Sequence, residues 1–287
     1  MSTTGRLRYT LPPPDGSKAH IDLRVDPSQN WLDDFHTVQI KDVRGREDHY
    51  TLDTAGCQYY RHPAKYTTFL NDEEIKDEYY PESMELIKRL TGATRVIIYT
   101  YGRLIILATQ SDLFMYGIPP VIRRGRPASS DDTVKHKTPA RLVHADQTMA
   151  DAHAIVRRYL SPSDAETIIQ GRFQTISFWR PISYPVVDWP LALCDFRSIN
   201  AERDLVAMSV IHHDHEDESY CAKYNPEHQW IYKSAMEPED LLIIKTFDSV
   251  QGGSVALHTA FQDPMTPEDA PYRQSIELRA ILYFGEN

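Results

Sequence analysis

Cysteine is scarce in this sequence. Its three cysteines, Cys57, Cys194 and Cys221, are odd in number, and none is spaced as Cys-x-x-Cys. Small disulfide-stabilised proteins carry paired cysteines at high density, so this pattern excludes a disulfide scaffold. We expect buried thiols in a reducing compartment and therefore a cytoplasmic protein.

Long apolar runs and basic tracts are also missing. No apolar run approaches the roughly 18 residues that a membrane-spanning helix needs, and residues 1–6 lack the apolar core of a signal peptide. The 31 Lys and Arg residues are outnumbered by 41 Asp and Glu residues, which gives a net charge of −10. An acidic chain without a basic patch is poorly suited to a nucleic-acid backbone. We therefore expect neither a membrane nor a nucleic acid as a partner.

Short stretches typical of β-strands recur along the chain, separated by turn residues. At 41% hydrophobic and 25% charged residues, the composition is that of a globular protein. Helices are expected over 72–90 (as a pair), 151–160 and 163–170. Many short strands with few helices predict a mainly β fold, a sandwich or barrel with helical additions. The expected strands are 37–43, 95–101 (a central strand), 173–181, 191–195, 205–212, 229–232, 241–248, 254–258 and 275–283.

A histidine and a carboxylate lie two residues apart in the stretch Val143-His144-Ala-Asp146. In an extended strand, residues i and i+2 point to the same face, so His144 and Asp146 can reach one point. His258, 114 residues after His144, could complete a set of three ligands. Two histidines and one carboxylate form the facial triad of non-haem Fe(II) oxygenases. The polar residues 122–137 precede this stretch, and we expect them to form a mobile loop over a pocket.

Two rival pairs with the same spacing occur further along the chain, His212/Asp214 and His215/Asp217. Spacing relative to His258 does not choose among the three pairs. The rivals fall within the wholly polar run 212–218, which is typical of a solvated loop or a hairpin tip. Metal sites are better held on strands with supporting contacts. We therefore expect this run to be a charged loop, with adventitious surface metal binding as a side effect.

An arginine and a serine, Arg273 and Ser275, follow His258 by 15 and 17 residues. Arg273 could bind one end of a dicarboxylate through two parallel hydrogen bonds. Ser275, two residues on, would point to the same face of a strand and add a hydroxyl. Arg279 lies on that face too and is the alternative anchor for the same carboxylate.

The sequence resembles the fungal gibberellin desaturase-like and AsaB-like hydroxylase/desaturase family, which includes relatives from the cephamycin pathway. The resemblance covers most of the chain. The segments that carry it are Tyr79–Glu82, Thr91–Ala93 with Arg95 and Val96, Val143–Thr148, Trp179–Pro181, Pro190–Ala192, Cys194–Asp195, Tyr224–Pro226 with His228, Trp230 and Tyr232, Lys245, Phe247–Ser249, His258–Phe261, Asp263–Pro264 and Arg273–Arg279.

This resemblance implies an oxygenase of secondary metabolism that uses Fe(II), 2-oxoglutarate and O2 on a double-stranded β-helix, the cupin-like jelly roll. It assigns the metal to His144, Asp146 and His258. We expect one domain, 1–287, in which residues 1–130 form N-terminal helical and strand additions and residues 138–287 the jelly-roll core. The residues expected at the substrate pocket, or in the shell that supports it, are Tyr224, Asn225, His228, Trp230 and Tyr232. For the aromatic residues among them, packing in the core is the alternative.

The expected substrate is a small molecule that is hydroxylated, desaturated or cyclised. The alternative is a metal-dependent isomerase or lyase, or a small-molecule binding protein, on the same barrel without 2-oxoglutarate. The sequence leaves the oligomeric state open and allows a homodimer.

Overall fold

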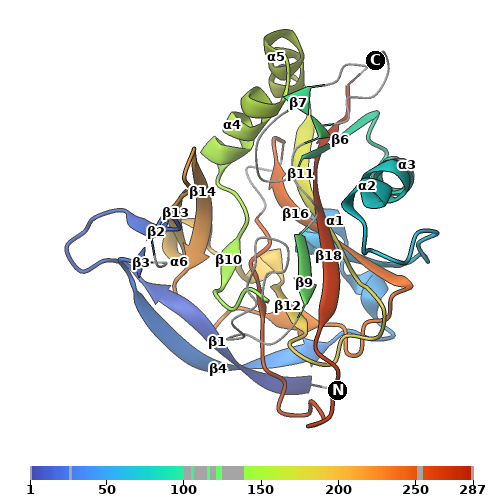
Figure 1. Ribbon diagram of the computed structural model, residues 1–287. Helices are drawn as coiled ribbons and strands as arrows, with labels where there is room; N and C mark the ends of the chain where they lie inside the picture. Colours follow the sequence, from blue (N-terminus) through green and yellow to red (C-terminus); the bar gives the residue numbers. More distant parts are fainter. Residues whose placement is uncertain are drawn as a thin grey trace.

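The computed structural model describes residues 2–25, 28–99, 105–106, 115–116, 121–124, 139–250 and 255–285. Two large β-sheets pack against each other and carry helices on their outer side and at one end (Figure 1). The fold is therefore the predicted mainly β jelly roll with helical additions. No helix among the described residues is long and apolar enough to cross a membrane.

The first sheet has ten strands in the order β1-β4-β15-β12-β17-β10-β14-β13-β2-β3. Its strands are β1 Ser2–Leu11, β2 Ala19–Asp22, β3 Ser28–Gln29, β4 Leu32–Asp42, β10 His144–Ala145, β12 Leu191–Cys194, β13 Leu205–Ile211, β14 Glu216–Ala222, β15 Trp230–Tyr232 and β17 His258–Ala260. The second sheet has six strands in the order β5-β16-β11-β18-β6, with β9 also paired to β18. Its strands are β5 Cys57–Arg61, β6 Arg95–Tyr99, β9 Val121–Arg124, β11 Phe173–Pro181, β16 Asp240–Asp248 and β18 Gln274–Tyr283, and a separate pair is formed by β7 Ile105–Ile106 and β8 Met115–Tyr116.

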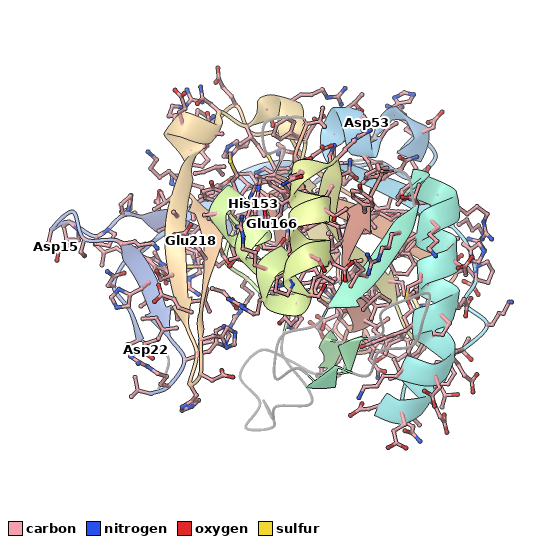
Figure 2. The ribbon with its side chains drawn as sticks, turned by 90° about the horizontal axis from the view of Figure 1, so that it is seen from above. Asp15, Asp22, Asp53, His153, Glu166 and Glu218 are labelled. Carbon is pink, nitrogen blue, oxygen red and sulfur yellow. The ribbon has the colours of Figure 1, made fainter. Side chains whose placement is uncertain are left out.

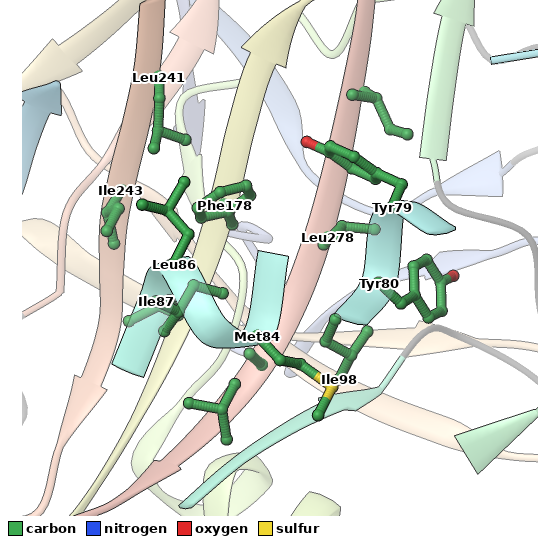
Figure 3. Packing of buried hydrophobic residues seen from close by; sticks show 14 of the residues in the cluster. Tyr79, Tyr80, Met84, Leu86, Ile87, Ile98, Phe178, Leu241, Ile243 and Leu278 are labelled. Atoms are coloured by element: carbon green, nitrogen blue, oxygen red, sulfur yellow. The ribbon is translucent and has the colours of Figure 1, made fainter. Parts of the chain in front are cut away.

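Strands β11 and β16 are buried along their whole length because both faces of the second sheet are covered. Phe178 and Ile243 point outward and pack with helix α3, Tyr80–Thr91 (Figure 3). Trp179 and Leu242 point inward and pack with side chains of β12 and β15 in the first sheet. The inner face of β11 therefore lies between the two sheets.

Helix α3 ends a longer helical run that the sequence predicts as two helices. The run begins with α2, Asp72–Glu74, capped by the Asn71 side chain, which accepts from the Glu73 N–H. A π-helical turn over Ile75–Tyr79 leads straight into α3, with Pro81 in its first turn. Proline lacks the N–H that a continuous α-helix needs, so the wider turn accommodates it without a break. Gly92 ends α3 in the left-handed conformation, with φ of 75°.

Two further helices cover the inner side of β6 at one end of the second sheet. They are α4, Met149–Tyr159, and α5, Pro162–Gln170. They pack against Ile97 and Tyr99, while Val96 and Ile98 on the other face pack with α3. The prediction that this strand is central is wrong for the described sheet, where β6 is the last strand in the order. Cover by helices on both faces explains its apolar sequence from Val96 to Tyr99. Two short helices, α1 Leu52–Ala55 and α6 Ala201–Asp204, complete the described set.

Three further expectations need adjustment. The polar run 212–218 contains the predicted hairpin tip, but the loop covers only 212–215, because β14 begins at Glu216 and pairs with β13 on one side. The strand expected over 254–258 starts at His258 and runs to Ala260. The predicted loop 122–137 lies outside the described residues, apart from its start in β9.

Candidate active site

His144 and His258 sit directly opposite each other on neighbouring strands. Strand β10 pairs antiparallel with β17, and His144 is the residue in register with His258. The two imidazole rings lie with their centroids 4.4 Å apart. Asp146 follows β10 immediately, so the backbone register brings all three predicted ligands to one point.

Backbone carbonyls orient both imidazole rings. His144 Nδ1 lies 2.7 Å from the Leu142 carbonyl oxygen, and His258 Nδ1 lies 3.1 Å from that of Ala256. A carbonyl oxygen only accepts, so Nδ1 carries the proton and Nε2 keeps a lone pair in the neutral ring. Each Nε2 lies 3.8 Å from Oδ1 of Asp146. Two nitrogen lone pairs and one carboxylate oxygen therefore converge, as metal coordination requires.

Three side chains fix Asp146, which is almost fully buried. The Ser177 hydroxyl on β11 donates to Oδ2 over 2.7 Å, and Arg279 on β18 donates to Oδ1 over 2.5 Å. The Ser219 hydroxyl on β14 donates to the backbone carbonyl of Asp146 over 2.9 Å. Burial raises the pKa of the Asp146 carboxyl, but Arg279 and the two imidazoles hold that pKa well below its usual range. The carboxylate is therefore ionised and held in one orientation.

A small cavity opens beside these residues. Arg273 and Glu277 line it together with the three predicted ligands. The rest of the wall is mostly apolar and is formed by Ala140, Trp179, Leu191, Ile244 and Ala260.

Arg273 is buried in this cavity and is held by contacts on three sides. Its guanidinium donates to Ser275 Oγ over 3.3 Å and to the Trp189 carbonyl over 2.8 Å, and it lies 5.0 Å from the ring centre of Trp179. Trp189 has φ of 47°, a left-handed backbone conformation unusual for a bulky residue, and this conformation accompanies the contact of its carbonyl with Arg273. The predicted pair Arg273 and Ser275 is thus brought together at the cavity, whereas Arg279 contacts Asp146 instead.

Glu277 and Ser177 belong to the site, although the sequence analysis did not single them out. Glu277 Oε1 accepts from Arg279 over 3.0 Å and lies 3.2 Å from the Ser177 hydroxyl, whose single proton is directed at Asp146. The alternation along β18 that places Arg273 and Arg279 on one face also places Glu277 there, so it could have been found by the same rule. Ser177 lies on another strand, and its position depends on the pairing of Ser177 with Arg279 across β11 and β18.

None of the five residues predicted at the substrate pocket, or in the shell that supports it, is among the described residues that line this cavity. Asn225 and His228 contact Oδ2 of Asp204 at 3.0 and 3.1 Å. Trp230 donates to Tyr9 Oη over 2.9 Å. The remaining two pack on other aromatic rings, Tyr224 on His36 and Tyr232 on Phe261. Their direct contact with substrate stays a prediction.

The rival histidines form a separate group. His212, His215 and Asp217 come together at the tip of the β13–β14 hairpin, without His258. The rival arrangements that share His258 therefore do not occur in the fold.

Comparisons with known proteins agree with this geometry. A family model described as an oxidoreductase/YMDC permease-like domain matches residues 7–283. The Fe(II)/2-oxoglutarate-dependent dioxygenase nvfI of Aspergillus novofumigatus is 29% identical over 95% of this chain and 94% of its own length. The hydroxylase/desaturase CTB9 of Cercospora beticola is 30% identical over 98% of this chain and 86% of its own length.

A solved structure supports the same relationship. The iron and alpha-ketoglutarate-dependent endoperoxidase NvfI superposes with a TM-score of 0.81 at 25% identity, covering 99% of this chain and 98% of that one. The chain belongs to the family of Fe(II)/2-oxoglutarate-dependent hydroxylases and desaturases that these fungal proteins represent, and it is a dioxygenase that uses Fe(II), 2-oxoglutarate and O2.

Proposed function

We propose that His144, Asp146 and His258 bind the iron with which this enzyme hydroxylates or desaturates a small molecule of secondary metabolism. The observation that carries the proposal is the convergence of two imidazole Nε2 atoms on one carboxylate oxygen, each at 3.8 Å. This donor set fits Fe(II), because two histidines and one carboxylate occupy one face of the ion and leave the other face open. When bound, iron supplies the oxidation of a C–H bond by O2, coupled to the conversion of 2-oxoglutarate to succinate and CO2.

Arg273 and Ser275 are the proposed ligands of the far carboxylate of 2-oxoglutarate. Arg273 lines the same cavity as the three metal ligands, and its guanidinium already donates to Ser275. A buried guanidinium offers parallel N–H donors that match a carboxylate. The contact between Arg279 and Asp146 disfavours Arg279 for this role, because that guanidinium already compensates the charge of a metal ligand.

The rest of the site orients the ligands and excludes water. Ser177 and Arg279 hold Asp146 from two sides, which keeps its carboxylate ionised and positioned. Trp179, Leu191 and Ile244 form an apolar wall beside the ligands. Such a wall limits the access of solvent to a reactive centre.

We further propose that residues 1–287 form one cytoplasmic oxygenase domain, with residues 138–287 carrying the iron site. This division is supported by the positions of the proposed ligands, which all lie after residue 138. The low cysteine content supports the location.

Uncoupled turnover tests the proposed function. The purified enzyme with Fe(II), 2-oxoglutarate and O2 should release succinate even without its natural substrate, and the His144→Ala variant should not. A metal-dependent isomerase or lyase on the same barrel would form no succinate and would leave 2-oxoglutarate unchanged. Product analysis with candidate substrates should look for alcohols, alkenes, ring closures and, given the endoperoxidase relative, peroxides.

A further inference from the structure

The hairpin formed by β13 and β14 ends in a four-residue loop that begins and ends with histidine. The loop is closed by a hydrogen bond from the His212 N–H to the His215 carbonyl, over 2.9 Å. Asp217 follows on β14 and is buried against α4. Figure 1 shows this hairpin rising beside α4, and Figure 2 shows Glu218, the next residue of β14, near the same helix. The loop therefore presents two imidazoles above a buried carboxylate.

The two imidazoles converge on a single oxygen of that carboxylate. His212 Nε2 lies 3.3 Å from Asp217 Oδ2, and His215 Nε2 lies 3.2 Å from the same atom. The rings are nearly parallel, at 5°, with centroids 4.3 Å apart. The lone pair of an imidazole nitrogen lies in the ring plane, so a cation shared by both nitrogens would tilt the two rings towards each other from this stack.

The carboxylate of Asp214 sets the tautomer of His215. Its Oδ1 lies 2.7 Å from His215 Nδ1, so that nitrogen carries the proton. Nε2 is then the ring nitrogen that faces Asp217 Oδ2, at 3.2 Å. A carboxylate that orients a histidine in this way is the usual partner of a metal-binding imidazole.

Asp217 is itself oriented from helix α4. Arg158 donates to its Oδ1 over 2.6 Å, which leaves Oδ2 directed at the two histidines. Asp217 is buried, and this ion pair links the hairpin to α4. A cation held by the histidines and Asp217 would therefore be tied to the helix that follows the active-site stretch.

We propose that His212, His215 and Asp217 bind a divalent cation of the zinc type, at a site separate from the iron centre. Tetrahedral zinc has bonds of about 2.0–2.2 Å, which places neighbouring ligand atoms roughly 3.3–3.5 Å apart. The two nitrogen–oxygen distances here, 3.3 and 3.2 Å, match this spacing. A set of two imidazoles and one carboxylate suits zinc better than magnesium or calcium, which prefer oxygen ligands. The ion would fasten the hairpin tip onto α4, and its fourth position would stay open to water.

Zinc titration of the tag-free full-length chain tests this site. The His144→Ala/His258→Ala double variant serves as the background, so that the proposed iron site does not bind the titrant. Calorimetry with Zn(II) should then show one equivalent bound per chain. Adding His212→Gln or His215→Gln to this background should weaken Zn(II) binding by at least about 100-fold. Adding Asp214→Asn should weaken it by roughly 10- to 100-fold, because Asp214 only orients the His215 ring. His213→Gln is the matched control, because that exposed histidine lies in the same loop outside the group.

Two independent readouts separate metal binding from a folding defect. Co(II) added to the same background should give the intense visible absorption of a tetrahedral site, and circular dichroism should show that each variant is folded. Zn(II) should also raise the melting temperature of the background chain and leave that of His212→Gln unchanged. The proposal would be overturned if His213→Gln weakened Zn(II) binding as much as His212→Gln does. It would also be overturned if folded His212→Gln still bound one equivalent of Zn(II) with unchanged affinity. Succinate release by the His212→Gln enzyme on the otherwise natural chain should stay normal, so failure of this site is distinguishable from failure of the proposed function.

Discussion

His144 and His258 are paired across two antiparallel strands, with their ring centroids 4.4 Å apart. The two side chains face the same point only in this register, because a shift of one residue in the pairing of β17 with β10 would turn His258 to the opposite face of the sheet. The backbone carbonyls that accept from the two Nδ1 atoms then aim both Nε2 atoms at Asp146. The order of the strands in the first sheet thus assembles a site from residues far apart in the chain.

Arg273→Ala should weaken the binding of 2-oxoglutarate. Loss of hydrogen bonds from a buried guanidinium to a carboxylate costs about 1.5–3 kcal/mol, or roughly 10- to 150-fold in affinity. The KM for 2-oxoglutarate should rise by that factor, while the affinity for Fe(II) changes little. Arg273→Lys should recover only part of the loss, because an ammonium lacks the planar pair of donors.

Arg279→Ala is the comparison that separates the two candidate arginines. Arg279 contacts Asp146 and Glu277, so its removal should weaken Fe(II) binding more than 2-oxoglutarate binding. The reverse pattern, with 2-oxoglutarate affinity lost in Arg279→Ala and retained in Arg273→Ala, would exchange the roles of the two residues.

Asp151→Asn should stabilise the protein at alkaline pH. Burial, together with the nearby Asp217 carboxylate, raises the pKa of Asp151 to about 7 from 3.8. Between these values the folded state holds a proton that the unfolded state has lost, so the free energy of unfolding falls as pH rises from about 4 to 7 and then levels. The variant should lack this fall and should be more stable at pH 8 by about 1–3 kcal/mol.

Urea unfolding at pH 5 and pH 8, with a chelator present, measures this difference. Asp164→Asn, at a half-exposed position in α5, controls for the general effect of losing a carboxylate. A pH dependence that is the same in Asp151→Asn and in the natural chain would contradict the raised pKa.

Asp204→Asn should lower stability without affecting catalysis. Although burial raises it, the pKa of Asp204 is held at about 2 by hydrogen bonds from Arg203, the Asn200 backbone, Asn225 and His228. This lowered pKa contributes stability that is present above about pH 4 and is lost as pH falls towards 2. We expect a loss of about 2–4 kcal/mol at pH 7 and a flatter acid limb in the unfolding profile.

Substrate and 2-oxoglutarate KM values should stay unchanged in Asp204→Asn, because Asn225 and His228 contact Asp204 and do not line the described cavity. Glu227→Gln removes an exposed partner of Arg203 and should change stability by less than about 1 kcal/mol. A selective rise in substrate KM for folded Asp204→Asn would instead place this network at the substrate.

The sequence alone predicted the arrangement of the site better than its surroundings. The alternation of His144 and Asp146, and of Arg273, Ser275 and Arg279, follows from strand geometry that every β-strand shares. The partner of each residue depends on which strands pair, and no local pattern contains that information. Alternation therefore placed Arg273 and Arg279 on one face, whereas their different contacts came from the packing of β18 against β11.

A polar composition does not distinguish a surface loop from a surface strand. Residues 216–218 are all acidic, yet β14 continues through them because one neighbour, β13, satisfies its backbone and Arg158 pairs with the buried Asp217. Tyr224, Asn225, His228, Trp230 and Tyr232 were expected at the substrate pocket or in its supporting shell, and their contact with substrate stays a prediction. The first four pack in the first sheet around Tyr9 and Asp204, and Tyr232 packs on Phe261.

Anaerobic spectroscopy of the Fe(II) complex tests the central claim most directly. With 2-oxoglutarate, the natural chain should show the weak visible charge-transfer band of the iron chelate. His144→Ala and His258→Ala should abolish this band, and His212→Ala, which alters the separate hairpin group, should retain it. Loss of the band in His212→Ala, together with its persistence in His144→Ala, would contradict the assignment of the iron to His144, Asp146 and His258.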